Sequence, residues 1–349
     1  MTAKLPTRQL GKDGPEVTAP GFGLMGLSAF YGAVGSDEER FKLLDAAYEM
    51  GENNWDSSDI YADSEDLVGK WFKRTGKRNE IFIATKFGIV MSDGGRGTRG
   101  DPEYVKQACN KSLKRLGIDC IDLYYCHRLD QETPVEETVK AMVELKNTLT
   151  QPTISEGKIK YLGLSECSAR SLRRAHAVHP ITAIQTEYSP FEISIESDEV
   201  NLLRTCRELG VSVIAYSPLG RGMLTGAYKS PDDFEEGDFR KHAPRFSKEN
   251  FPKNLELAGK IAELATKKGV TPGQLSLAWL MSQGKDVVPI PGTKKLKYLE
   301  ENVRAIKVVL SKEEGGEIRK AVEGAEVHGV RYPEGMMGTL YADTPELKA

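Results

Sequence analysis

The chain has 349 residues, of which 39% are hydrophobic and 28% charged, and its formal net charge is −3. These proportions are typical of a globular protein with a large core, and the small acidic excess argues against nucleic acid or anionic membranes as general partners. The five cysteines form no Cys-x-x-Cys pair, which favours reduced thiols and a cytoplasmic location. We expect neither a signal peptide nor a membrane span, because no apolar run reaches ~18 residues.

Short apolar runs alternate along the chain with longer segments of helical periodicity. The segments expected to form strands are 19–25, 53–58, 80–88, 122–127, 159–166, 182–190, 212–220 and 287–292. The segments expected to form helices are 36–50, 64–72, 102–117, 134–146, 169–178, 198–210, 255–269 and 275–283. Eight strands separated by helices predict an α/β fold, a single (β/α)8 TIM barrel in which residues 1–349 form one domain.

Three segments interrupt this alternation. Residues 219–254 follow the seventh strand and greatly exceed the ~2–6 residues of an ordinary connection, so we expect a functional lid. Residues 324–349 follow the last helix and are expected to fold over the barrel mouth, with a disordered tail as the alternative. The Gly-rich segment 93–100 is expected to be a flexible loop, and an RNA-binding arm is the weaker alternative.

Polar residues close several of the predicted strands. They are Asp56, Lys86, His127, Ser165, Gln185 and Tyr216. In a (β/α)8 barrel the active site forms at the C-terminal ends of the strands. Each residue alone fits a solvated loop position, but an Asp, a Lys and a His at the ends of three successive strands favour a shared site.

Tyr61 follows Asp56 by five residues and is expected to point into the same barrel mouth. We expect Lys86 to stabilise the phenolate and so lower the pKa of Tyr61, while Asp56 orients Lys86. His127 would hydrogen-bond a substrate oxygen near Tyr61. This set suits protonation of a carbonyl oxygen, and because no side chain supplies hydride, it implies a nicotinamide cofactor. A metal site is disfavoured, since no Cys or His spacing surrounds His127.

The motifs WDSSDIY, ATKFG, YYCH, GLSE, YSPLGRGMLTG and PIPGTKK resemble those of the aldo-keto reductases, and the resemblance covers nearly the whole chain. It implies a catalytic tetrad of Asp56, Tyr61, Lys86 and His127, in which Tyr61 is the general acid for reduction of an aldehyde or ketone. It also implies NADPH bound in an extended form across the barrel mouth. A cofactor-sensing regulatory subunit, similar to potassium-channel β subunits, is the alternative function.

The resemblance further implies which residues contact NADPH. Ser165, Glu166 and Gln185 match the residues that hold the carboxamide, and Tyr216 matches the ring that stacks on the nicotinamide. The full set of implied cofactor contacts is Gly23, Met25, Gly26, Asp56, Ser165, Glu166, Gln185, Tyr216, Ser217, Pro218, Leu219, Gly220, Gly222, Pro291, Gly292, Thr293, Lys294, Glu301 and Asn302. A preference for NADPH over NADH is expected from the hydroxyl and ammonium groups of Thr293, Lys294, Lys295 and Lys297.

The substrate is a small-molecule carbonyl that the sequence leaves open among aromatic aldehydes, pyridoxal, sugars and polyketide-derived ketones, and the oligomeric state is open as well. The resemblance is to a microbial and plant subgroup that includes pyridoxal reductases. The residues expected to line the substrate pocket are Phe30, Tyr31, Trp55, Phe87, Arg128, Tyr188 and Tyr332, with Met336 and Met337 from the tail. Two features depart from the family pattern. Glu166 stands where asparagine is common, and 147–155 looks inserted.

Overall fold

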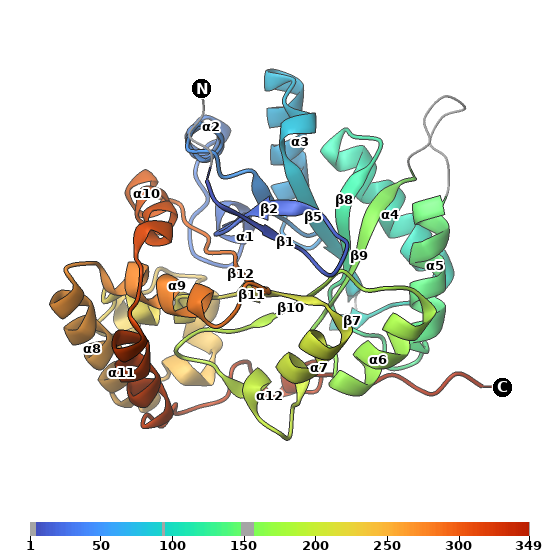
Figure 1. Cartoon of the computed structure of the whole chain (residues 1–349). Coiled ribbons are helices and arrows are strands. Elements are labelled where there is room, and N and C mark those ends of the chain that lie inside the picture. The colour runs from blue at the N-terminus through green and yellow to red at the C-terminus, as the bar shows by residue number, and fades with distance from the viewer. Residues whose placement is uncertain (1–4, 93–94, 148–156, 349) are drawn as a thin grey trace.

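The computed structural model describes residues 5–92, 95–147 and 157–348. The eight predicted strands form one parallel sheet in the order β3-β4-β5-β8-β9-β10-β11-β12 (Figure 1). Their bounds are β3 Phe22–Gly23, β4 Asn54–Asp56, β5 Phe82–Phe87, β8 Ile121–Cys126, β9 Ile159–Ser165, β10 Ala183–Glu187, β11 Ser212–Tyr216 and β12 Val287–Pro289. The amides of Gly21 and Gly23 donate to the carbonyls of Pro289 (2.9 Å) and Pro291 (3.2 Å). These bonds join the first strand to the last, so the predicted barrel is confirmed.

Helices follow the strands in the predicted order. The longer ones are α2 Asp37–Glu49, α3 Ser64–Thr75, α4 Pro102–Leu116, α5 Val135–Asn147, α6 Ala169–Val178, α7 Leu202–Leu209, α8 Asn250–Lys268, α9 Pro272–Ser282, α10 Leu296–Arg304 and α11 Lys312–Glu323. The short ones are α1 Met25–Ser28 and α12 Glu334–Met337, with 3-10 turns η1 Arg78–Glu80, η2 Ser194–Glu196 and η7 Ala305–Lys307. Helix α2 starts where predicted, because Ser36 and Glu39 form a capping box. No helix of the described residues is long and apolar enough to cross a membrane.

A hairpin of β1 (Thr7–Gln9) and β2 (Glu16–Thr18) covers the N-terminal end of the barrel. The amide of Gly11 donates to the hydroxyl of Ser212, the first residue of β11 (2.8 Å). Leu10 and Val17 are buried in the barrel interior together with Val288. The N-terminal end is thereby filled with apolar side chains, which leaves the C-terminal ends of the strands as the place for polar groups.

The predicted lid contains the 3-10 turns η3 Gly220–Thr225, η4 Pro231–Asp233, η5 Phe239–His242 and η6 Pro244–Phe246. It crosses to the loop after β3, where the amide of Phe239 donates to the carbonyl of Phe30 (2.9 Å). The C-terminal tail reaches the end of β9, where the amide of Ala342 donates to the carbonyl of Glu166 (2.9 Å). Both segments therefore cover the barrel mouth, as predicted.

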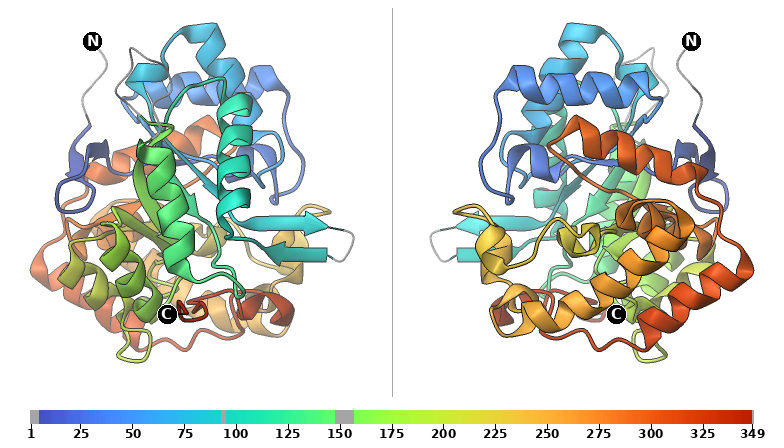
Figure 2. Two further views of the ribbon diagram at one scale, coloured as in Figure 1. Left: turned by 90° about the vertical axis from the view of Figure 1, so that its right-hand side faces the viewer. Right: turned by 90° about the vertical axis from the view of Figure 1, so that its left-hand side faces the viewer.

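The structure corrects the prediction of a flexible loop at 93–100. Residues Ile89–Ser92 form β6 and Gly95–Thr98 form β7, and the two strands pair antiparallel with Ile89 opposite Thr98. This hairpin projects from the body of the barrel (Figure 2). Of the segment that looks inserted, Asn147 ends α5 and residues 148–155 lie outside the described residues.

Candidate active site

Asp56, Tyr61 and Lys86 meet at the C-terminal ends of the neighbouring strands β4 and β5. The ammonium of Lys86 donates to Oδ1 of Asp56 (2.5 Å), to the carbonyl of Ser57 (2.5 Å) and to the hydroxyl of Tyr61 (3.3 Å). The side chain of Lys86 is fully buried, and Asp56 and Tyr61 are buried as well. A buried ammonium therefore links a carboxylate on one side to a phenol on the other.

The ionisation of this cluster follows from burial and from its own charges. Burial alone would lower the pKa of Lys86, but Asp56 and Tyr61 outweigh it and the pKa is raised, so the ammonium persists. For Tyr61 the outcome differs from our prediction. Lys86 does act to lower its pKa, but burial dominates and the pKa lies above its ordinary value of 10. Tyr61 is consequently protonated at neutral pH and has a proton to donate.

His127 follows β8 and packs its ring edge-to-face against Tyr61, with ring centroids 5.8 Å apart. Its Nδ1 lies 3.1 Å from the hydroxyl of Ser58. Burial, followed by the positive charges of Arg128 and Lys86, lowers its pKa well below the ordinary value. His127 is therefore a neutral hydrogen-bonding group beside the Tyr61 hydroxyl.

We expect the pH profile of kcat/KM for carbonyl reduction to lack an acidic limb with a pKa near ~6.5, the ordinary value for histidine. The reason is that His127 is already neutral and Lys86 stays charged between about pH 6 and 9. A limb near 6.5 that disappears in His127→Gln would contradict this. A limb that persists in His127→Gln but disappears in Asp59→Asn would instead belong to Asp59, whose pKa burial raises to about 7.

Ser165 and Gln185 lie side by side, because β9 and β10 pair with these two residues in register. The amide of Gln185 donates to Oδ2 of Asp56 (2.8 Å), and a guanidinium nitrogen of Arg128 donates to the hydroxyl of Ser165 (3.3 Å). A hydroxyl and an amide thus stand next to the tetrad, which is the donor and acceptor set that a carboxamide requires.

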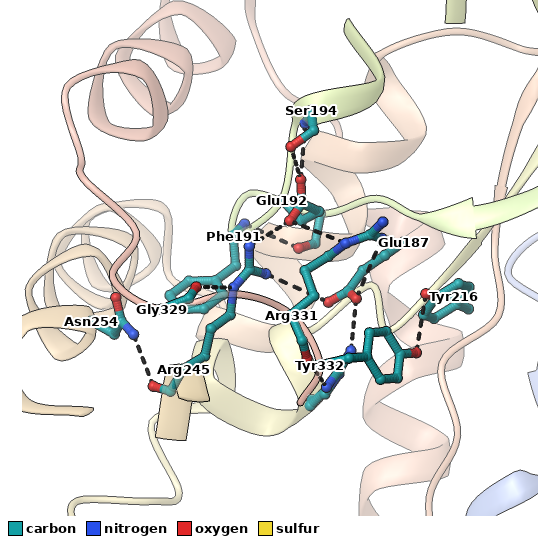
Figure 3. Close-up of polar contacts among 12 residues, drawn as sticks. Glu187, Phe191, Glu192, Ser194, Tyr216, Arg245, Asn254, Gly329, Arg331 and Tyr332 are labelled. Atoms are coloured by element: carbon teal, nitrogen blue, oxygen red, sulfur yellow. Dashed lines mark hydrogen bonds and ion pairs between the residues drawn. The ribbon is translucent and has the colours of Figure 1, made fainter. Parts of the chain in front are cut away.

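Glu166 is bound by the C-terminal tail. Arg331 donates to both of its carboxylate oxygens (3.0 and 2.9 Å), and the hydroxyl of Tyr216 donates to one of them (2.8 Å). Tyr332 lies with its hydroxyl 3.2 Å from that of Tyr216 (Figure 3). Glu166 is fully buried, and Arg331 lowers its pKa against the effect of burial. Glu166 is therefore a fixed carboxylate that joins the tail to the Tyr216 ring.

Two further buried ion pairs flank this contact. Arg221 of the lid donates to Glu187 (2.9 Å) and to the carbonyl of Arg331 (2.8 Å). Arg245 donates to Glu192 (2.6 Å) and to the carbonyl of Gly329 (3.1 Å). Figure 3 shows the carboxylates of Glu187 and Glu192 converging on the guanidinium groups from the lid and tail. Our sequence analysis named none of these three arginines as site residues.

The loop after β11 has an unusual backbone. Ser217, Gly220, Arg221 and Gly222 have φ of 48°, 58°, 54° and 94°. Left-handed residues close together in the sequence turn their backbone N–H groups to one side, where these groups can bind a phosphate. Pro218 and Leu219 lie within the same loop. This backbone fits the pyrophosphate of a dinucleotide.

The segment after β12 contains residues that were predicted to contact the phosphate of the adenosine end of NADPH. The ammonium of Lys294 donates to the carbonyls of Tyr31 (2.5 Å) and Ala33 (3.1 Å), whereas Lys295 is exposed and Thr293 half-buried. Gly292 lies so close to Gly23 that an added Cβ would meet its carbonyl oxygen at 2.5 Å. The remaining predicted contacts lie in or beside two helices, with Met25 and Gly26 in α1, Pro291 before α10 and Glu301 and Asn302 in α10. The donor set from Ser165 to Lys295 fits a nicotinamide dinucleotide.

The structure corrects three members of the predicted substrate pocket. Trp55 packs on Trp71 of α3 with ring centroids 4.7 Å apart, Phe87 approaches Tyr104 of α4, and Tyr188 packs against Trp279 of α9. All three lie between the sheet and the helices. For Trp55 and Phe87 the reason is that strand side chains alternate and their neighbours Asp56 and Lys86 take the inward positions. The predicted pocket residues that do lie at the mouth are Phe30, Tyr31, Arg128 and Tyr332.

Comparisons with known proteins agree with this geometry. The model of the Aldo/keto reductase family matches residues 21–323. The aldo-keto reductase str7 of Strobilurus tenacellus is 56% identical over 348 residues, covering 98% of this chain and 99% of that protein. The NADP(+) aldo-keto reductase yakc of Schizosaccharomyces pombe is 52% identical over 347 residues, with coverages of 98% and 99%.

Solved structures show the same fold. A thermostable aldo-keto reductase, Tm1743, in complex with the inhibitor epalrestat has a TM-score of 0.72 at 28% identity, covering 91% of this chain and all of that one. The glycerol dehydrogenase AKR11B4 from Gluconobacter oxydans has a TM-score of 0.79 at 26% identity, with coverages of 93% and 97%. Arg331 and Tyr332 lie beyond the segment that the family model matches.

Proposed function

Because the chain belongs to the aldo/keto reductase family, we propose that it is an NADPH-dependent reductase that converts an aldehyde or ketone to the alcohol, with Tyr61 as the general acid. The observation that supports this mechanism most directly is the contact of the buried Lys86 with both Asp56 and Tyr61. Burial keeps the phenol of Tyr61 protonated, and the contact places a cation where it can stabilise the phenolate that forms once the proton is donated.

Each residue of the tetrad then has a separate role. NADPH, when bound, supplies the hydride for the carbonyl carbon. Tyr61 donates its proton to the carbonyl oxygen as negative charge develops there. Lys86 stabilises the resulting phenolate, and Asp56 with Gln185 holds the ammonium in place. Neutral His127, held at Nδ1 by Ser58, orients the substrate oxygen.

The function is tested by following NADPH absorbance with 4-nitrobenzaldehyde and with pyridoxal as substrates. We expect turnover of at least one of them, dependent on Tyr61. Tight NADPH binding without turnover of these or of a wider carbonyl series would contradict a reductase and favour a cofactor-sensing subunit.

We expect the protein to bind NADPH more tightly than NADH, and Lys295→Met to reduce the difference by about tenfold. Lys294 is already engaged by two backbone carbonyls, so the exposed ammonium of Lys295 is the better partner for the 2′-phosphate. Fluorescence titration with both nucleotides measures the effect. Lys285→Met is the control, because Lys285 is exposed and precedes the N-terminal end of β12, at the opposite end of this strand from Lys295. Equal affinity of the wild type for NADPH and NADH would contradict the assignment.

A further inference from the structure

The buried charges around the barrel mouth can be paired one by one. Five cations have a carboxylate within ion-pair distance, and the pairs are Lys86–Asp56 (2.5 Å), Arg331–Glu166 (2.9 Å), Arg221–Glu187 (2.9 Å), Arg245–Glu192 (2.6 Å) and Arg240–Asp238 (2.6 Å). Arg128 is a sixth buried cation, and its side chain has no such partner among the residues that the structure describes. Among these buried cations, Arg128 is therefore the one without a matching carboxylate.

Arg128 is directed toward the catalytic groups and not into the protein core. It follows His127 directly, and it donates to the carbonyl of His127 (2.7 Å) and to the hydroxyl of Ser165 (3.3 Å). Its Nε is buried without a hydrogen-bond partner. Only 3% of the residue is exposed. The carboxylate of Glu166 acts on the charge of Arg128, but Arg331 already binds both of its oxygens. Burying a charge without a counter-charge of its own is costly, so a guanidinium kept in this state is best explained by an anion that binds there.

A second cation lies on the same side of the mouth. Arg96 projects from β7, and its guanidinium contacts the Sδ of Met336 in the tail (3.5 Å). Its charge adds to those of Arg128 and Lys86 in acting on His127. In the described part of the chain Arg96, too, has no carboxylate partner. Two arginines thus surround the place where the carbonyl oxygen would meet Tyr61 and His127.

We propose that the natural substrate carries an anionic group, a carboxylate or a phosphate, and that Arg128 binds this group while the carbonyl lies at Tyr61 and His127. Arg96 increases the local positive potential at the entrance. This inference rests on the proposed carbonyl reduction and narrows its substrate class. A charge-assisted bidentate contact with a guanidinium is among the strongest recognition contacts for such anions.

The test compares aldehydes that differ only in charge. The pairs are 4-carboxybenzaldehyde with its methyl ester, 3-carboxybenzaldehyde with its methyl ester, and pyridoxal 5′-phosphate with pyridoxal. We expect wild-type kcat/KM to favour the anionic member of at least one pair by about tenfold to a hundredfold. Which pair shows the preference distinguishes carboxylate from phosphate and indicates the distance of the anion from the carbonyl.

We expect Arg128→Met to bring this selectivity ratio close to one and Arg128→Lys to restore it in part. Arg99→Met is the control for loss of an arginine, because Arg99, directly after the β6–β7 hairpin, is exposed and paired with Asp101. Calorimetric binding of terephthalate, which cannot be reduced, gives a readout without turnover, and Arg128→Met should abolish it. Circular dichroism and thermal melting establish that each variant is folded.

Several outcomes would overturn the inference. A wild type that reduces the methyl esters as well as the free acids, and pyridoxal as well as its phosphate, retains the proposed reductase function but has no anionic subsite. If Arg128→Met weakens NADPH binding and leaves the selectivity ratio unchanged, then Arg128 serves the cofactor. If the wild type reduces none of the aldehydes, the proposed function itself fails, whereas terephthalate binding still reports on the anion site.

Discussion

Tyr61→Phe is expected to lower kcat for carbonyl reduction by about a hundredfold to ten thousandfold, the usual contribution of a general acid. The ring and its packing against Phe30 and His127 would remain, so the affinity for NADPH should change little. Only the hydroxyl that faces Lys86 at 3.3 Å is removed. Steady-state kinetics with a fluorescence titration of NADPH measures both quantities.

Tyr188→Phe is the control for loss of a buried tyrosine hydroxyl. Tyr188 is as buried as Tyr61, but its hydroxyl donates to Glu196 outside the barrel mouth. Loss of this hydroxyl should lower the stability of the protein and leave kcat unchanged. If Tyr61→Phe retained more than about a tenth of the wild-type kcat, another group would have to supply the proton, and the assignment of the acid would be wrong.

Arg331→Met is expected to destabilise the protein by about 3–5 kcal/mol, because it leaves the carboxylate of Glu166 buried without its cation. The change should also weaken NADPH binding, since Glu166 holds the hydroxyl of Tyr216. The double variant Arg331→Met/Glu166→Gln should recover much of the stability, because the buried charge is then absent. Urea unfolding measures the free energies.

Arg204→Met is the matched control for removal of an ion-paired arginine. Arg204 pairs with Asp198 at the exposed surface, where such pairs contribute about 0–1 kcal/mol. An Arg331→Met variant no less stable than Arg204→Met would show that the tail does not contribute to the stability of the barrel. Weakened NADPH binding at unchanged stability would separate the effect on Tyr216 from the effect on folding.

The barrel and the proximity of the tetrad could be predicted from the sequence, because both follow from local patterns. Alternating apolar runs give the strands, and the ends of parallel strands meet at one face. The same reasoning should have excluded Trp55 and Phe87 from the pocket. Neighbouring strand residues point to opposite faces, and Asp56 and Lys86 already occupied the inner one. The pairing of β6 with β7 also had a local signal, because the sequence has Asp-Gly-Gly directly after Ser92.

No local sequence pattern indicated which residue binds Glu166. Arg331 is 165 residues further along the chain, in a segment without periodicity, and only the closed barrel brings the two together. Arg221 stood between two glycines that were predicted to contact the cofactor, but nothing local indicated that its side chain would turn away to Glu187. Charges matched over such separations depend on the tertiary fold, so the sequence could show that Glu166 was unusual but not what binds it.

The position of Arg331 and Ala342 after the last strand of the barrel has a consequence for synthesis. Domains begin to fold from the N-terminus as they emerge from the ribosome, and every strand of the barrel precedes residue 290. Until Arg331 emerges, Glu166 lacks its bidentate cation and the end of β9 lacks its contact with Ala342. The nascent barrel is thus incomplete at the substrate end until residues 331–342 have been translated. A product that ended between residues 290 and 330 would have all eight strands but not the finished site.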